Sequence, residues 1–216
     1  MNRESGRGPW KLPVLAAGAS NAVGGGLAEA GGTVVWITAG ARLEVSGFVP
    51  APSGAGHLLL EGVAGQATLA SSEPDEAAVL DVLARRLGQL AVEQVLCDDG
   101  VLQMYRAICL LRGVKARRID VPRIVAYAAA ARDPQCSRAL SMFCGLLGDL
   151  AGHVALTLGA RGGVLIAGDI VTSLGDWFAR SAFRRRFESR GRYRDTLCAI
   201  PTGVVGAAVA PRFALA

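Results

Sequence analysis

The chain has 216 residues, of which 51% are hydrophobic and 19% are charged, so it can form a globular domain and is not a disordered chain. The formal net charge is +5, and much of the surplus lies in residues 184–195, where arginines alternate with Glu188 and Asp195 as on a solvated helix face. Aromatic residues make up only 6% of the chain, which supplies few side chains for base stacking and argues against nucleic-acid binding.

The N-terminal part of the chain predicts an extension followed by strands. Residues 1–11 are polar and basic and predict a flexible extension, after which residues 12–216 are expected to form one domain. Apolar or β-branched runs separated by glycines predict about three antiparallel strands, at residues 12–17, 27–28 and 33–38. The hairpin turn is expected at Gly31 and Gly32. Residues 40–57 are rich in Gly, Pro and Ser and predict an exposed loop excursion.

The middle of the chain predicts helices. Apolar residues recur at helical spacing in four segments, residues 72–87, 101–111, 121–131 and 134–158. Ser72 is the expected N-cap of the first helix, with Pro74 in its first turn. Residues 164–167 then predict a buried strand that ends at Gly168 and precedes a helix over 170–180, so that backbone N–H groups can face a ligand. This order predicts a single α/β domain with a mixed β-sheet flanked by helices.

The use of cysteine and histidine indicates reduced, cytoplasmic thiols. The five cysteines form an odd set without a C-x-x-C pair, and the only histidines are His57 and His153, so neither a disulfide framework nor a metal site is expected. Residues 1–11 lack the apolar segment of a secretory signal. Residues 140–171 are apolar but interrupted by charged groups, so we expect a cytoplasmic protein without membrane association.

Individual motifs leave alternatives open. Residues 18–26 can cradle phosphates with backbone amides, but a flexible glycine-rich turn explains them equally well. Glu93 can bind a hydroxyl group or simply be solvated. His153 falls on the apolar face of the helix predicted over 134–158 and is expected to be a hydrogen-bonded core residue. Residues 98–100, Asp-Asp-Gly, can hold a cation or form a turn before the next helix.

The order of the sequence blocks is more specific than any one motif. Seven blocks occur in the order found in bacterial glucokinases, and they are Gly65-Gln-Ala-Thr-Leu-Ala70, Glu76-Ala-Ala-Val-Leu80, Val92-Glu93-x-Val-Leu96, Tyr105-Arg-Ala-Ile108, Arg138-Ala-Leu-Ser-Met-Phe-Cys144, Ala160-Arg-Gly-Gly-Val-Leu-Ile-Ala-Gly168 and Phe183-Arg-x-Arg-Phe-Glu188. The chain therefore resembles the bacterial glucokinase family from about residue 12 to about residue 201. The resemblance implies the ribonuclease-H-like (actin-like ATPase) fold and, within it, the C-terminal one of two lobes.

The resemblance also implies a reaction and its ligands. Glucokinases transfer the γ-phosphoryl group of ATP, bound with Mg²⁺, to the 6-hydroxyl of glucose, and positioning and charge stabilisation do most of the work. The family's catalytic base lies on the N-terminal lobe and has no counterpart in this chain, so no catalytic residue is assigned. Contacts to glucose or another hexose are implied at Glu93 and Gln66. Contacts to the nucleotide are implied at Gly18, Asn21, Gly24, Gly168 and Asp169.

The ligand motifs depart from the family pattern. Residues 18–24 keep the outer glycines of the phosphate loop G-x-G-T-G-x-G but replace the central ones, and residues 62–66 read G-V-A-G-Q where the family has the sugar-gripping G-E-G-G-H. Asp169 replaces the second glycine of the adenosine turn, and Cys97 and Asp98 stand where the family has Ser-Gly. The blocks that form the core are kept, so the sequence indicates a lobe with degenerate ligand motifs.

Three functions follow, from different classes. The first is a degenerate lobe retained for binding or assembly, without turnover of its own. The second is half of a split kinase that is completed by a complementary N-terminal kinase lobe. The third is a non-enzymatic, nucleotide-binding regulatory module. In each case we expect a partner, either that lobe or a second copy of the chain, because the cleft face of a lone lobe exposes apolar surface.

Overall fold

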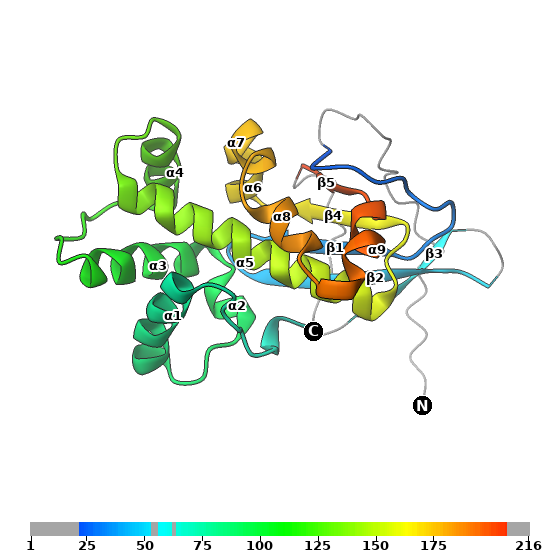
Figure 1. Ribbon diagram of the computed structural model, residues 1–216, viewed down its shortest axis with the longest axis horizontal. Coiled ribbons are helices and arrows are strands. Elements are labelled where there is room, and N and C mark those ends of the chain that lie inside the picture. Colours follow the sequence, from blue (N-terminus) through cyan, green and yellow to red (C-terminus); the bar gives the residue numbers. More distant parts are fainter. Residues whose placement is uncertain (1–21, 53–55, 62–63, 207–216) are drawn as a thin grey trace.

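The fold is built on a five-stranded mixed β-sheet. The computed structural model describes residues 22–52, 56–61 and 64–206. Its strands are β1 (Val34–Ala39), β2 (Leu43–Pro50), β3 (His57–Glu61), β4 (Gly163–Ala167) and β5 (Thr202–Val204), in the spatial order β3-β2-β1-β4-β5 (Figure 1). Strands β1 to β3 pair in antiparallel fashion, whereas β4 runs parallel to β1 and β5 parallel to β4. The predicted α/β class with a mixed sheet is therefore confirmed.

The expected loop at residues 40–57 is wrong, because strand β2 occupies residues 43–50 within it. Residues 43–48 of β2 pair with the whole of β1, with Val35 opposite Gly47. Gly47 lies within this strand and packs against α5, since a Cβ there would lie 2.9 Å from Cδ1 of Leu158. Pro50 ends the strand, where a missing N–H disturbs the ladder least.

The position of the hairpin also differs from the prediction. The turn lies at residues 40–42, where the backbone N–H of Gly40 donates to the carbonyl of Arg42 at 3.2 Å, and not at Gly31 and Gly32. Residues 27–28 are not a strand; the N–H of Leu27 donates to the carbonyl of Ala199 near the C-terminal end of α9. The predicted strand over 12–17 and the predicted extension over 1–11 lie outside the described residues.

Helices follow the first three strands. They are η1 (Ala64–Gln66), α1 (Pro74–Leu87), α2 (Val92–Val95), α3 (Asp98–Leu111), α4 (Val121–Ala129), α5 (Pro134–Leu158), α6 (Asp169–Leu174), α7 (Asp176–Ala179), α8 (Phe183–Glu188), η2 (Gly191–Tyr193) and α9 (Arg194–Ala199). The N-cap of α1 is Glu73 and not Ser72. The helix predicted over 170–180 is divided into α6 and α7 at Gly175, whose φ of +50° interrupts a right-handed helix.

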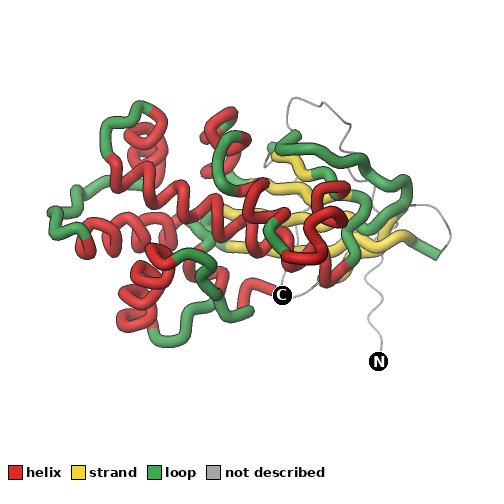
Figure 2. Tube along the Cα trace, in the orientation of Figure 1, coloured by secondary structure: helices red, strands yellow, loops and turns green. Residues whose placement is uncertain are grey.

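The long helix α5 forms the centre of the core. Its side chains share one buried cluster with Val35, Ile37 and Ile166 on one face of the sheet. By length and composition α5 could also cross a membrane, but 78% of its most apolar window is buried inside the fold. Figure 2 shows α1, α3 and α4 extending beyond the sheet, at the end of the molecule away from β3.

Two of the arginines expected on a solvated face, within residues 184–195, are buried instead, whereas Arg185, Arg192 and Arg194 are exposed as expected. Arg184 and Arg186 are 9% and 3% exposed. They are buried because α8 lies directly against α5, where a Cβ on Gly148 would come within 2.2 Å of the carbonyl oxygen of Phe183. Arg184 donates to the carbonyls of Ile200 and Cys198 at 2.8 and 3.0 Å. Because Gly148 has no side chain, α8 can approach α5 closely, and this approach buries two arginines of a basic helix.

Candidate functional site

The two residues predicted to contact sugar are brought together. Gln66 ends the short helix η1 and Glu93 lies in α2, and the Nε2 of Gln66 donates to the Oε1 of Glu93 at 2.5 Å. The N–H of Val92 donates to the carbonyl of Ala67 at 2.9 Å, which fixes α2 against the turn. Gly65 permits this approach, because a Cβ there would lie 3.0 Å from the Oε2 of Glu93. Val63 lies outside the described residues.

An apolar hollow of about 300 Å³ lies next to this turn, between β2, β3 and α5. Its lining includes Ala64 and Ala67 from the turn and Leu60, Leu150 and Val154 from the sheet and helix. His153 also lines it and is exposed, so the expectation of a hydrogen-bonded core histidine is wrong. The apolar lining offers few partners for sugar hydroxyls, which require polar groups when they are buried.

The residues predicted to contact the nucleotide are divided between two places. Gly168 and Asp169 lie where β4 ends and α6 begins. Gly24 lies near the opposite end of the sheet's parallel strands, since its neighbour Val23 pairs with Thr202 at the start of β5. A Cβ on Gly24 would come within 2.5 Å of the Arg184 side chain, so Gly24 packs on α8 and does not join Gly168. Gly18 and Asn21 lie outside the described residues.

The carboxyl ends of β1 and β4 form a single edge, as expected for neighbouring parallel strands. Gly168 has φ +130°, and a Cβ there would lie 1.9 Å from the carbonyl oxygen of Ala39, so only glycine fits. The turn after β1 reaches a third element, because the N–H of Asp98 donates to the carbonyl of Gly40 at 2.8 Å. The hairpin turn, the start of α3 and the start of α6 therefore meet at the edge where ligands of open α/β sheets bind.

The sequence prediction did not place Gly40 at this edge, and it named Asp98 only as a candidate cation ligand and as a departure from the family's Ser-Gly. The sequence did contain a signal for Gly40. Residues 34–40 are an apolar strand followed by glycine, the same pattern that drew attention to Gly168 at residues 163–168. Residues 98–100 form the first turn of α3, with the Cys97 side chain accepting from the N–H of Gly100 as its N-cap. They therefore belong to the helix, which begins at Asp98 and not at the predicted residue 101, and do not form a turn before it.

The electrostatics of the edge are unfavourable to anions. Burial raises the pKa of Asp98, and the nearby charge of Asp169 raises it further. Within the described part of the chain, the Oδ1 of Asp98 is buried and accepts no hydrogen bond. The edge therefore carries two carboxylates, and the charge of Asp169 disfavours the ionised form of Asp98.

ATP with Mg²⁺ does not fit the side chains that meet here. Sites for polyphosphate offer N–H donors and cations, as helix N-termini and arginine forks do. Here the starts of α3 and α6 carry Asp98 and Asp169, whose charge opposes that of a phosphate. No group of three or more His, Cys, Asp or Glu side chains suited to a metal ion occurs among the described residues. Among the described residues, the side chains at the starts of α3 and α6 thus provide no cationic clamp for a phosphate.

Comparison with known proteins identifies the family. The family model described as Glucokinase matches residues 9–213. A curated glucokinase from Aromatoleum aromaticum is 46% identical over 194 residues, which cover 90% of this chain and 58% of the relative, so the chain spans somewhat more than half the length of such a protein.

Solved structures agree on the fold. The crystal structure of a glucokinase from an Antarctic psychrotroph matches with a TM-score of 0.79 at 24% identity, covering 88% of this chain and 59% of that one. A glucokinase from Balamuthia mandrillaris in complex with glucose matches with a TM-score of 0.71 at 16% identity, covering 80% of this chain and 50% of that one. The sheet and its helices thus have the glucokinase arrangement, and the chain belongs to the glucokinase family.

Proposed function

We propose that this chain is a glucokinase-family lobe, acting in the cytoplasm, that binds other components but does not phosphorylate sugar on its own. The observation that supports this most directly is the pair Asp98 and Asp169 at the carboxyl edge of β1 and β4, where the family pattern has glycines. A carboxylate in each position repels the phosphates of a nucleotide and adds side-chain volume where the family has none.

The test compares nucleotide binding in matched charge variants. MgATP at millimolar concentration should leave the melting temperature of the wild-type protein unchanged. The double variant Asp98→Asn, Asp169→Asn should gain a shift, because a ligand at about 100 times its Kd stabilises a fold by about 2.7 kcal/mol, or roughly 5–10 °C at this chain length. The control is Asp81→Asn, Asp195→Asn, which removes the same charge from exposed positions elsewhere.

A coupled assay for glucose 6-phosphate completes the test. The expected result is no product at any concentration of the purified protein. A rate that rises in proportion to protein concentration and disappears in Glu93→Gln would overturn the proposal. A MgATP shift in the wild-type protein without turnover would instead favour the third possibility, a nucleotide-binding regulatory module.

A split kinase is the second candidate, and one observation favours it. Glu93 is kept and is held by Gln66 at 2.5 Å, on a turn that is tied to α2, so the carboxylate that the family pattern assigns to the sugar has a fixed position. Co-expression with the N-terminal lobe of a related glucokinase should then give a complex with sugar kinase activity. Failure of the two lobes to co-purify would exclude this candidate, and Glu93→Gln in the complex is the matched control.

Self-association is the form of assembly that we expect for the isolated chain. The edge strand β3 exposes Leu58 and Leu60 by 47% and 43%, and Leu60 also borders the apolar hollow beside η1. An exposed apolar edge strand favours pairing with another chain. Sedimentation equilibrium should show oligomers that dissociate on substitution of Leu58 and Leu60 by serine, whereas a strict monomer at high concentration would contradict this expectation.

A further inference from the structure

The positive charge of the molecule is concentrated at one end. Residues 112–138 hold seven arginine or lysine side chains and two aspartates, a surplus of five positive charges that equals the net charge of +5 of the whole chain. Both aspartates already have backbone partners, because Asp120 caps α4 and the buried Asp133 caps α5. The basic side chains are exposed or half-buried. This end, formed by α3, α4 and the start of α5 (Figure 1), therefore carries a concentrated positive charge.

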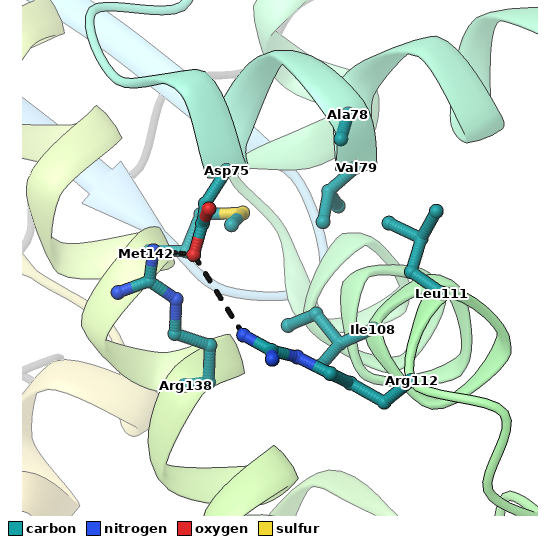
Figure 3. A pocket seen from close by; sticks show the side chains of 8 residues that line it. All are labelled: Asp75, Ala78, Val79, Ile108, Leu111, Arg112, Arg138 and Met142. Atoms are coloured by element: carbon teal, nitrogen blue, oxygen red, sulfur yellow. Dashed lines mark hydrogen bonds and ion pairs between the residues drawn. The ribbon is translucent and has the colours of Figure 1, made fainter.

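Two hollows open beside this surface. The first, of about 250 Å³, lies between α1, α3 and α5 and is lined by the apolar side chains of Val79, Ile108 and Met142 (Figure 3). The second, of about 310 Å³, shares Ile108 and is bounded by residues 134–135 at the start of α5. Residues 134–142 extend about 12 Å along the axis of α5, so the hollows together match two turns of a bound helix. We name them the α3–α5 groove.

Two arginines stand at the junction of the hollows and line both of them. Arg112, from the end of α3, and Arg138, from α5, point toward the same carboxylate, Asp75 (Figure 3). Their Nη2 atoms lie 3.9 and 2.8 Å from its Oδ2. The Arg112 side chain is 66% exposed. Asp75 is therefore shared by two guanidinium groups. Because its contact with Arg112 is the longer one, Arg112 can pair with a carboxylate of a binding partner.

We propose that the α3–α5 groove binds an acidic amphipathic segment of a partner protein. Carboxylates of the segment would pair with Arg112 and Arg138, and an apolar side chain would enter the hollow over Ile108 and Met142. The exposed Leu110 and Leu111 at the end of α3 extend the apolar surface beside the groove. Helix-in-groove recognition combines these two features, an apolar anchor and complementary charge.

A protein segment fits this surface better than a nucleic acid or a membrane. The aromatic ring of Tyr127 is covered by the guanidinium groups of Arg117 and Arg123, at 5.7 and 5.6 Å from its centroid, and so cannot stack on a base. Leu110, Leu111 and Val114 are exposed at the end of α3, but Val79, Ile108 and Met142 line hollows, which an inserted side chain of a protein segment fills and a lipid surface does not.

Fluorescence anisotropy with a defined probe tests the proposal. The probe is a fluorescein-labelled peptide of glutamates with leucines at helical spacing, titrated with the full chain. Binding should weaken about tenfold in Arg112→Gln, Arg138→Gln, which corresponds to about 1.4 kcal/mol. The matched control, Arg85→Gln, Arg192→Gln, removes the same charge from exposed positions and should change affinity by less than about twofold.

Two further titrations separate the groove from charge alone. A peptide with serines in place of the leucines should bind about tenfold more weakly, because it cannot fill the hollow. Equal weakening by the two arginine double variants would overturn the proposal, as would equal affinity for the leucine and serine peptides. Tighter binding to vesicles containing phosphatidylserine, or to duplex DNA, than to the leucine peptide would also overturn it, in favour of that partner.

Discussion

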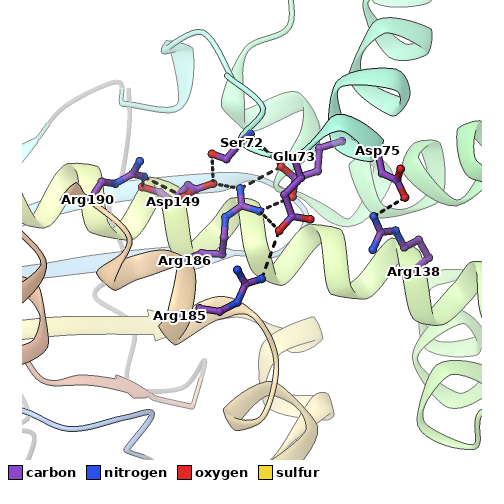
Figure 4. A network of polar contacts seen from close by, with 9 residues as sticks. Ser72, Glu73, Asp75, Arg138, Asp149, Arg185, Arg186 and Arg190 are labelled. Atoms are coloured by element: carbon purple, nitrogen blue, oxygen red, sulfur yellow. Dashed lines mark hydrogen bonds and ion pairs between the residues drawn. The ribbon is translucent and has the colours of Figure 1, made fainter.

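Glu76 and Arg186 lie 110 residues apart in the sequence and form a buried, two-pronged ion pair, with Nη1–Oε1 and Nη2–Oε2 distances of 2.8 and 3.1 Å. Their side chains are 3% and 4% exposed. Arg186 also donates to Asp149 of α5, and Asp149 in turn accepts from Ser72 and Arg190 (Figure 4). The network ties the first turn of α1 to α5 and α8, so three separate segments of the chain depend on one guanidinium group.

Replacing one member of this pair should destabilise the fold. Glu76→Gln leaves the buried Arg186 with one carboxylate fewer, and breaking a buried pair costs about 3–5 kcal/mol, here expected near the lower value because Asp149 remains. Asp81→Asn breaks the exposed pair with Arg85 and should cost less than about 1 kcal/mol. Urea unfolding measures the loss of stability in each variant. Equal midpoints would show that the buried network contributes no more to stability than the exposed pair.

Gly168 should tolerate no side chain. Gly168→Ala would place a Cβ 1.9 Å from the carbonyl oxygen of Ala39 at a φ of +130°, and we expect a loss of about 3 kcal/mol or more. The control is Gly159→Ala at the end of α5, where φ is +61° and no atom lies within 4 Å of the added Cβ, so about 1 kcal/mol is expected. If thermal unfolding shows a similar loss of stability in the two variants, the backbone at the contact between β1 and α6 can move to make room for a methyl group.

Asp98 should make stability depend on pH. Its pKa is raised by burial and by Asp169 from the ordinary value of 3.8, so between the two pKa values the folded protein binds more protons than the unfolded one. The free energy of unfolding therefore falls as pH rises through this window, and the penalty is fully present at neutral pH. Asp98→Asn should raise stability at pH 7, and the gain should vanish below about pH 3.8.

The matched control for this pH dependence is Asp99→Asn. Asp99 is exposed on the same first turn of α3, so its replacement removes the same favourable interaction with the helix N-terminus without relieving a buried charge. Urea titrations at several pH values measure the difference between the variants. A gain in Asp98→Asn that is no larger than in Asp99→Asn, or that persists at low pH, would contradict the expectation.

The thiols should react in an order set by burial. Burial raises the pKa of Cys144 to about 12, and burial and the charge of Asp133 raise that of Cys136 to about 12, so both are protonated and shielded. Cys198 is only half-buried, and we expect it to react first with Ellman's reagent at pH 8. Cys198→Ser should remove the first phase of labelling, and rapid labelling of the remaining four thiols in the native protein would contradict the structure.

Much of the helical part of the fold could be predicted from the sequence. The helix over 134–158 agrees with α5 at both ends, because Asp133 is a side-chain cap and Gly159 adopts the left-handed conformation that ends a helix. The strand at residues 164–167 and its terminal glycine agree with β4 and Gly168. In these segments the residues that favour the helix or strand locally are also the ones that the packed fold needs.

Part of the candidate site could be predicted as well. Glu93 and Gln66 lie 27 residues apart and were singled out only through the family pattern, yet they meet in the structure. Gly40 and Asp98 were missed as components of the edge, because their meeting with Gly168 depends on the parallel pairing of β1 with β4 across more than 120 residues of chain. No local pattern encodes such a contact.

By itself, the sequence determined the α/β class, the positions of the main helices and the family, because periodicity, caps and block order are local properties of the chain. Only the tertiary structure decided that residues 43–50 form a strand, that Arg184 and Arg186 are buried, and that Asp98 faces Asp169. The physical reason is common to all three. A strand that contains a glycine and ends in proline, a buried arginine and a pair of like charges are each locally unfavourable, and each depends on partners supplied by distant segments of the chain.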